Sequence, residues 1–297
     1  ALSLVLSVHL LAAETPKEAT SFTKEKNEQV LKELPFSDTQ DFEDAKRGFI
    51  AAPEKLIIKD SENAPVSWDM TTYDFIQGNA PQTVNPSLWR IAELNKLNGL
   101  FQVTDRVYQV RGYDVANVTF VKSDNGWIVF DCTTSSETAK AALELLESKF
   151  GKAHIAAVVV SHAHIDHYGG IGGLIDEKDV ADSSLPLDEQ IKSGKTLIIV
   201  PEGYEKAVME ENVFAGNAMK RRTNFQYGSL LDKGGKGSLS VGIGLTPSSG
   251  TTTYISPSYE VKKATETIKV DGVEMVFQLT PNTESPAEMN TYLPKYK

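Results

Sequence analysis

The most informative segment of this sequence is Ser161–Gly170, which reads SHAHIDHYGG. Three of the five histidines in the chain fall within it, together with the carboxylate of Asp166. The residues just before it, Ile155–Val160, are apolar and mostly β-branched, as is typical of a buried strand. A strand that ends in histidine and aspartate presents those side chains at the carboxyl edge of a sheet, where layered α/β folds bind ligands.

The side chains of this segment suit a metal site. Imidazole and carboxylate bind zinc, iron or manganese, and a lone cysteine, Cys132, excludes a thiolate cluster. His162 and His164 are two residues apart and face the same way if the segment is extended. Asp166 and His167 follow the start of a turn and can face a second ion, so that two metals would clamp a displacement reaction. A histidine-rich surface loop is the less favoured alternative.

Composition narrows the classes of protein. With 297 residues, of which 40% are hydrophobic and 24% charged, the chain fits one large globular domain with an extension, or two small domains. The net charge of −10 argues against a nucleic-acid partner, because phosphate binding needs a basic face. One cysteine excludes an internal disulfide and leaves the redox compartment open.

The first thirteen residues are apolar and end in Ala12 and Ala13, before Glu14 begins a polar stretch. This run is too short to cross a bilayer, so we expect no membrane span. It matches the end of a secretory signal, which predicts a periplasmic or secreted protein in which residues 1–14 are the remnant of a signal peptide. A buried N-terminal helix is the alternative.

Residues 15–84 are charge-rich at their start and predict an N-terminal extended arm, partly disordered, that wraps the main domain. A short helix is possible at residues 42–49. We expect the main domain to occupy residues 85–297, with loops at residues 176–195 and 230–258.

Within this domain the pattern predicts the order strand, strand, helix, strand, metal loop. A helix is expected from Pro86, which suits a first helical turn. Apolar periodicity, caps and the turns Asn125-Gly126 and Asp271-Gly272 place the other elements. They are strands at residues 117–121, 127–131, 156–160, 196–201, 267–270 and 273–279, and a helix at residues 136–150.

The motif formed by His162, His164, Asp166 and His167 resembles the H-x-H-x-D-H signature of the metallo-β-lactamase superfamily. The resemblance implies an α/β fold, the αββα sandwich, in which the first two histidines bind one ion and the aspartate and third histidine bind another. Asp131 matches a position that steadies the metal loop by hydrogen bonds. A simple turn aspartate is an equally good reading of that residue.

From about residue 65 to the end, the sequence is similar to the alkyl sulfatases, which hydrolyse esters such as dodecyl sulfate. This resemblance implies two zinc ions, with Glu284 as a further ligand and Asp166 as the catalytic carboxylate. Tyr227 would line the pocket. Arg221 and Arg222 either attract the sulfate or form a solvated basic pair. The similar segments are Asn85–Arg90, Gly99–Phe101, Val107–Asp114, Gly126–Val129, Glu137–Glu144, Ala215–Met219, Arg221–Arg222, Gln226–Gly228 and Thr283–Asn290.

The implied reaction converts an alkyl sulfate into an alcohol and inorganic sulfate through metal-activated water, with an apolar tunnel for the alkyl chain. No histidine follows His167. We therefore expect the remaining ligands to lie beyond Lys297, along with the helical dimerisation domain and the sterol-carrier-like domain of the family. The full-length protein would be a homodimer. Residues 180–190 form a longer stretch than the family leads us to expect and would reshape the pocket rim.

Two alternatives remain open. The chain could be another hydrolase of the same superfamily, acting on a lactam, a thioester or a phosphodiester. It could also be a non-catalytic protein that binds metal without turnover.

Overall fold

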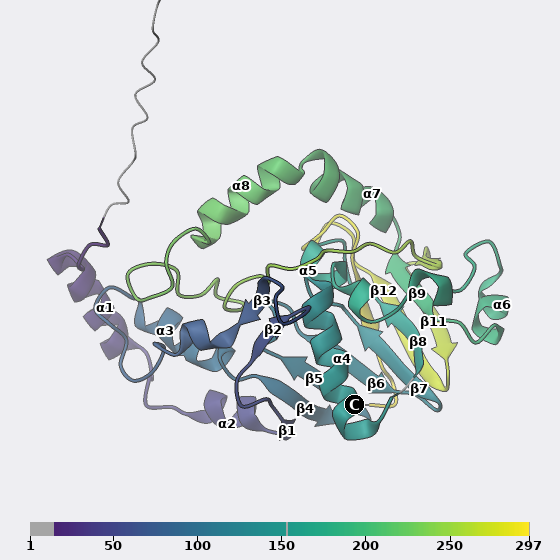
Figure 1. Ribbon diagram of the computed structural model, residues 1–297, viewed down its shortest axis with the longest axis horizontal. Helices are drawn as coiled ribbons and strands as arrows, with labels where there is room; N and C mark the ends of the chain where they lie inside the picture. The colour runs from purple at the N-terminus through teal and green to yellow at the C-terminus, as the bar shows by residue number, and fades with distance from the viewer. Residues whose placement is uncertain (1–14, 153, 297) are drawn as a thin grey trace, which may run out of the picture.

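The computed structural model of the protein describes residues 15–152 and 154–296, so the expected signal remnant lies outside the described residues. An eight-stranded sheet in the order β1-β4-β5-β6-β7-β8-β9-β10 forms the centre (Figure 1). Its strands are β1 (Phe49–Ala51), β4 (Gly99–Thr104), β5 (Val107–Arg111), β6 (Val118–Lys122), β7 (Gly126–Phe130), β8 (His154–Val159), β9 (Leu197–Pro201) and β10 (Tyr259–Val261).

The pairing of these strands determines where functional side chains gather. Strands β4 to β7 form an antiparallel meander, and the predicted Asn125-Gly126 turn joins β6 to β7. Strands β7, β8, β9 and β10 are parallel. Parallel strands end at the same edge, so Asp131 after β7 and the Ser161–Gly170 segment after β8 meet there.

A second sheet packs on one face of the large sheet. It has the order β11-β12-β13, with bounds β11 (Thr265–Val270), β12 (Val273–Leu279) and β13 (Met289–Tyr292). Along β12 the buried Val273, Met275 and Phe277 alternate with more exposed residues, as a half-buried strand requires. These side chains pack against residues of the large sheet, such as Ile128 and Ile199, to form the core between the sheets.

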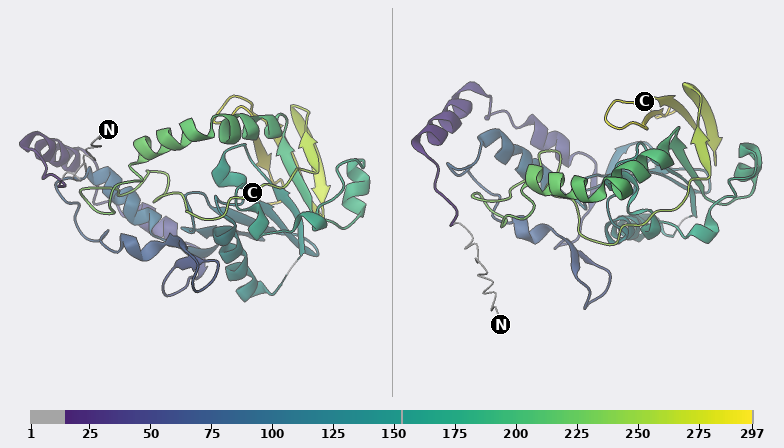
Figure 2. Two further views of the ribbon diagram at one scale, coloured as in Figure 1. Left: turned by 45° about the horizontal axis from the view of Figure 1, so that its top comes forward. Right: turned by 90° about the horizontal axis from the view of Figure 1, so that it is seen from above.

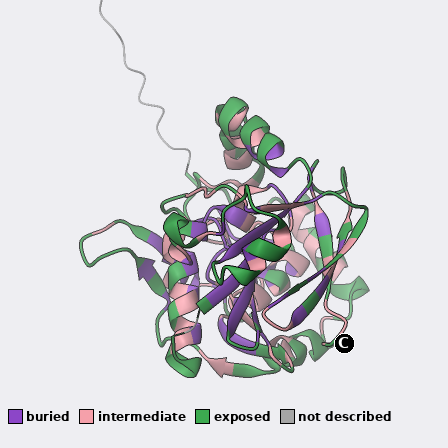
Figure 3. Cartoon of the chain, turned by 90° about the vertical axis from the view of Figure 1, so that its right-hand side faces the viewer, coloured by how far each residue is buried: buried purple, intermediate pink, exposed green. Residues whose placement is uncertain are grey.

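Helices cover the other face of the large sheet. The main one is α4 (Ser136–Phe150), which has the bounds expected from the sequence and buries Ala139, Ala142 and Leu146. Gly151 ends it with a φ of 79°, a left-handed conformation that glycine adopts readily. The layers are therefore helix, sheet and sheet, and the buried residues gather in the central strands (Figure 3). They correspond to three of the four layers of the expected sandwich.

The N-terminal segment is more regular than the extended arm that the sequence predicts. It contains α1 (Ser21–Glu33) and α2 (Gln40–Lys46), and β1 pairs with β4 at the edge of the large sheet. Helix α1 has no buried residue, and Thr20 caps it by accepting from the Thr23 N–H. Its lysines and glutamates, which we interpreted as disorder, are also good helix formers. Figures 1 and 2 show α1 at one end of the molecule.

Two predicted loops are also more structured than expected. Residues 176–195 contain a short 3₁₀-helix (Glu177–Asp179) and α6 (Leu187–Lys192), with the buried Gln190 side chain donating to the carbonyls of Leu185 and Ser258. Residues 230–258 have no helix or strand, yet Leu239 and Leu245 are buried. This stretch is therefore not a surface excursion along its whole length.

The buried carboxylate of Asp114 holds part of this irregular stretch in place. It accepts hydrogen bonds from the N–H and Oγ of Ser248, from the N–H and Oγ1 of Thr134, and from Thr138 Oγ1. Burial raises the pKa of Asp114, and these hydrogen bonds oppose that rise. The Asp114 side chain thus contacts Ser248, which lies 134 residues away in the sequence.

The remaining elements lie around this framework. They are a small hairpin of β2 (Ile57–Lys59) and β3 (Val66–Asp69), 3₁₀-helices at Met70–Tyr73 and Ile171–Gly173, helices α3 (Pro86–Asn95), α5 (Ile165–Tyr168), α7 (Tyr204–Val208) and α8 (Gly216–Tyr227), and a π-helix at Met209–Phe214. Across residues 15–152 and 154–296, no helix is both long and apolar enough to cross a membrane.

Candidate metal centre

The metal motif begins where β8 ends. After a bend at Ala163, His164 precedes α5 with a φ of −74° and a ψ of 144°, which is an extended conformation. The two side chains face the same way, and His162 Nε2 and His164 Nδ1 lie 3.1 Å apart. Asp166 and His167 then lie within the single turn of α5. The first pair and the second pair therefore come from different local geometries, as the sequence indicates.

Glu284 reaches this motif from the loop between β12 and β13. The Met289 N–H donates to the Ser161 carbonyl at 2.9 Å, and His162 forms an isolated bridge with Glu288. The Glu288 carboxylate accepts the N–H groups of Glu284 and Ser285, which shapes the loop. This loop-shaping role of Glu288 is one that the sequence analysis missed.

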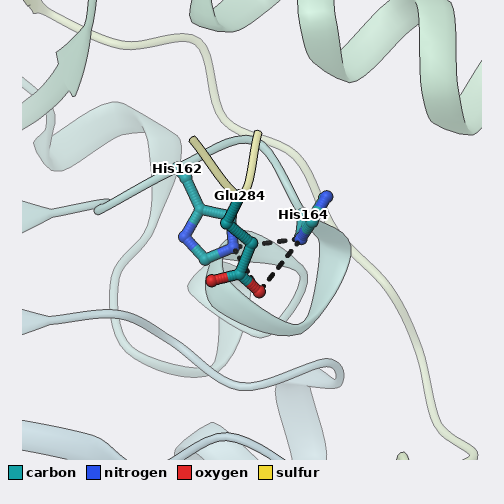
Figure 4. Close-up of side chains that lie close together, drawn as sticks. All are labelled: His162, His164 and Glu284. Atoms are coloured by element: carbon teal, nitrogen blue, oxygen red, sulfur yellow. Dashed lines mark hydrogen bonds and ion pairs between the residues drawn. The ribbon is translucent and has the colours of Figure 1, made fainter. Parts of the chain in front are cut away.

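Together, the donor atoms of His162, His164 and Glu284 form a triangle suited to one ion (Figure 4). Glu284 Oε1 lies 3.9 Å from His162 Nε2 and 3.8 Å from His164 Nδ1, and the two nitrogens are 3.1 Å apart. A point equidistant from these three atoms is about 2.1 Å from each, which is the usual length of a Zn–N or Zn–O bond. The residues present therefore fit a metal ion.

Asp166 and His167 form a second, incomplete set of donors. Asp166 Oδ2 is 3.4 Å from His167 Nε2, and the rings of His162 and His167 have centroids 4.0 Å apart. Within the described residues, the cluster of three or more potential ligands is the one formed by His162, His164 and Glu284. Asp166 and His167 therefore offer two candidate ligands for a second ion.

Electrostatics differ sharply among these groups. Burial, reinforced by the neighbouring His167 and His164, lowers the pKa of His162. Burial also disfavours the charged form of His167, but hydrogen bonds to Asp131 and Asp166 outweigh it and raise the His167 pKa to about 10. Burial opposes ionisation of Asp166, yet the hydrogen bond and charge of His167 lower its pKa.

Asp131 has the contacts that the predicted steadying role requires. Its Oδ1 accepts the Ser161 N–H at 2.8 Å, while its Oδ2 accepts from Ser161 Oγ at 3.0 Å and lies 2.9 Å from His167 Nδ1. With a φ of 59°, Asp131 adopts a left-handed conformation that costs a non-glycine residue about 1–3 kcal/mol. These three contacts stabilise the strained turn.

Other predicted site residues lie farther along the chain. Tyr227 is the last of the 12 residues of α8, so it lies about 16 Å along the helix axis from Gly216. No hydrogen bond or ion pair between described residues joins it to the histidines. Arg221 and Arg222 are exposed on α8. Their proposed contacts with substrate stay predictions.

Comparison with known proteins places this geometry in a family. A family model described as "Metallo-beta-lactamase superfamily" matches residues 111–261, which include the histidine motif. The chain belongs to the metallo-β-lactamase superfamily. The resemblance noted in the sequence is thereby confirmed, and so is the fold.

Relatives within this superfamily are alkylsulfatases. A linear primary-alkylsulfatase from Pseudomonas sp. is 44% identical and is matched by 100% of this chain. The alkyl/aryl-sulfatase BDS1 of Saccharomyces cerevisiae is 42% identical over 95% of the chain. The structure of the sec-alkylsulfatase Pisa1 from Pseudomonas sp. superposes with a TM-score of 0.85 at 42% identity, covering 95% of this chain and 43% of that one. The chain spans 43% of the length of the first of these relatives.

Proposed function

We propose that the protein hydrolyses alkyl sulfate esters of the dodecyl sulfate type to an alcohol and inorganic sulfate. The observation that carries this proposal is the three-donor cluster of His162, His164 and Glu284 in a chain similar along its length to alkylsulfatases. In this proposal the cluster holds one zinc ion, while Asp166 and His167 hold a second and Asp166 is the catalytic carboxylate. Such ions activate water and offset the charge of the departing sulfate.

In this proposal, residues of this chain position the metal ligands. His162 and His164 present one nitrogen each to the first ion because the strand end fixes both backbones. Asp131 orients His167 through Nδ1, which leaves Nε2 directed toward Asp166. The apolar tunnel, the homodimer and the periplasmic or secreted location are part of the same proposal.

Substrate preference tests the proposed function. The full gene product, loaded with zinc, is given dodecyl sulfate, a β-lactam, a thioester and a phosphodiester in parallel. Release of inorganic sulfate with little turnover of the other three supports an alkylsulfatase. Faster turnover of any other substrate would instead assign the protein to a different class of hydrolase within the superfamily. Tight zinc binding without turnover of any of the four indicates the non-catalytic alternative.

A further inference from the structure

Glu211 faces the side of His164 that points away from the metal centre. Its Oε2 lies 3.7 Å from His164 Nε2, and the side chains are 24% and 29% exposed. The other ring nitrogen of His164, Nδ1, faces His162 Nε2 and the Glu284 carboxylate. The two nitrogens of this imidazole therefore have separate partners, one set at the site and one carboxylate behind it.

The other two histidines of the motif show the same arrangement. Ser161 Oγ donates its hydrogen to Asp131, so it accepts from His162 Nδ1 at 2.9 Å and leaves His162 Nε2 free to bind metal. His167 Nδ1 is bound by Asp131, which leaves its Nε2 toward Asp166. In metal sites, an oxygen on the outer nitrogen fixes the tautomer and the ring orientation of each histidine. For His164 the outer nitrogen is Nε2, and the nearby oxygen belongs to the Glu211 carboxylate.

The element that carries Glu211 is unusual. It is the π-helix Met209–Phe214, which joins α7 to α8. In Figures 1 and 2, these helices cross over the sheet edge at which α5 lies. Single π-helical turns are rare and frequently occur at functional sites. The neighbouring Glu210 instead pairs with Lys206 at 3.8 Å, and its side chain is 59% exposed.

We propose that Glu211 is a positioning residue that accepts the Nε2–H of His164 and so keeps Nδ1 unprotonated for the metal. This inference depends on the metal centre of the proposed function. A separation of 3.7 Å exceeds the usual hydrogen-bond length of about 2.7–3.2 Å, and a change in the side-chain torsions of Glu211 can close the difference. Glu211 would thereby couple the π-helix to the occupancy of the site.

Zinc affinity tests the role of Glu211 independently of catalysis. The dissociation constant is measured for the full gene product by competition with a chromophoric chelator, in wild-type protein and in Glu211→Ala, Glu211→Gln and Glu210→Ala variants. We expect Glu211→Ala to weaken zinc binding about 10–100-fold, as loss of such outer partners does. Glu211→Gln retains an oxygen acceptor and should fall between Glu211→Ala and wild type. Glu210→Ala removes a neighbouring charge and should match wild type.

The tautomer of His164 provides a second measurement. In ¹⁵N-histidine spectra of the zinc-loaded protein, we expect the Nε2–H of His164 to be protected from exchange in wild type and to exchange faster in Glu211→Ala. Equal zinc affinities in Glu211→Ala and wild type, or equal losses in the Glu211→Ala and Glu210→Ala variants, would overturn the role of Glu211. A folded wild-type protein that binds no zinc would instead overturn the metal centre itself. Should Glu211→Ala not fold, the comparison of Glu211→Gln with Glu210→Ala decides the question.

Discussion

Replacing Asp131 with asparagine should lower the free energy of unfolding of the metal-free protein, by an amount that depends on pH. Asparagine keeps the shape of the side chain and one carbonyl oxygen, so the backbone contact with Ser161 can persist. The change removes the negative charge that lies 2.9 Å from His167 Nδ1. We therefore expect the loss of stability to come mainly from the weaker stabilisation of the His167 imidazolium.

The pKa of His167 gives the size of this loss. A rise from 6.5 to about 10 corresponds to roughly 5 kcal/mol, because each pKa unit is about 1.4 kcal/mol. Asp131 and Asp166 both contribute, so removing the charge of Asp131 should cost about 2 kcal/mol of unfolding free energy. Since the folded-state pKa is raised, this stabilisation is complete below about pH 6.5 and disappears as the pH rises through about 10.

Urea denaturation of chelator-treated protein at pH 6, 8 and 10 measures this effect. We expect the difference between wild type and Asp131→Asn to be largest at pH 6 and to shrink toward pH 10. Asp176→Asn is the matched control, because Asp176 is exposed and pairs with Lys178 at the surface. A difference that is absent, or that is the same at all three pH values, would refute the reasoning.

Three further predictions follow from the structure. His164→Ala should abolish sulfate release, with a loss larger than the roughly 100-fold expected for an outer partner, while circular dichroism shows the fold retained. In urea denaturation, Gly170→Ala should lower the free energy of unfolding by about 3 kcal/mol or more, because a Cβ at this position overlaps neighbouring carbonyl oxygens. Gly216→Ala is the control: a Cβ at Gly216 meets open space, so the same measurement should change by less than about 1 kcal/mol. Asp114→Ala should cost about 3 kcal/mol by the same measurement and expose residues near Ser248 to limited proteolysis.

Local patterns in the sequence predicted much of the framework. The spacing of His162 and His164 predicted that the two side chains face the same way, and two of their nitrogens lie 3.1 Å apart; helix α4 has the predicted bounds. Such features depend on residues close together in the chain, and the periodicity of strands and helices determines which of these residues share a face. Glu284, by contrast, was identified only through the resemblance to a family, because it reaches the site from a different sheet.

Long-range contacts and rare backbone conformations could not be predicted in this way. Glu211 reaches His164 through a π-helix, and helical periodicity does not reveal where an extra residue enters a turn. The contact of Asp114 with Ser248 spans 134 residues, so neither local sequence indicates it. The charged residues of α1 favour both solvation and helix formation, and composition alone did not separate these outcomes.

Metal-dependent release of sulfate tests the central claim most directly. Inorganic sulfate from dodecyl sulfate is measured with the full gene product as purified, after removal of metal by a chelator, and after zinc is restored. The account predicts activity that is lost on chelation and recovered with zinc. Sulfate release that survives complete removal of metal, or its absence from a folded zinc-loaded protein, would contradict the account.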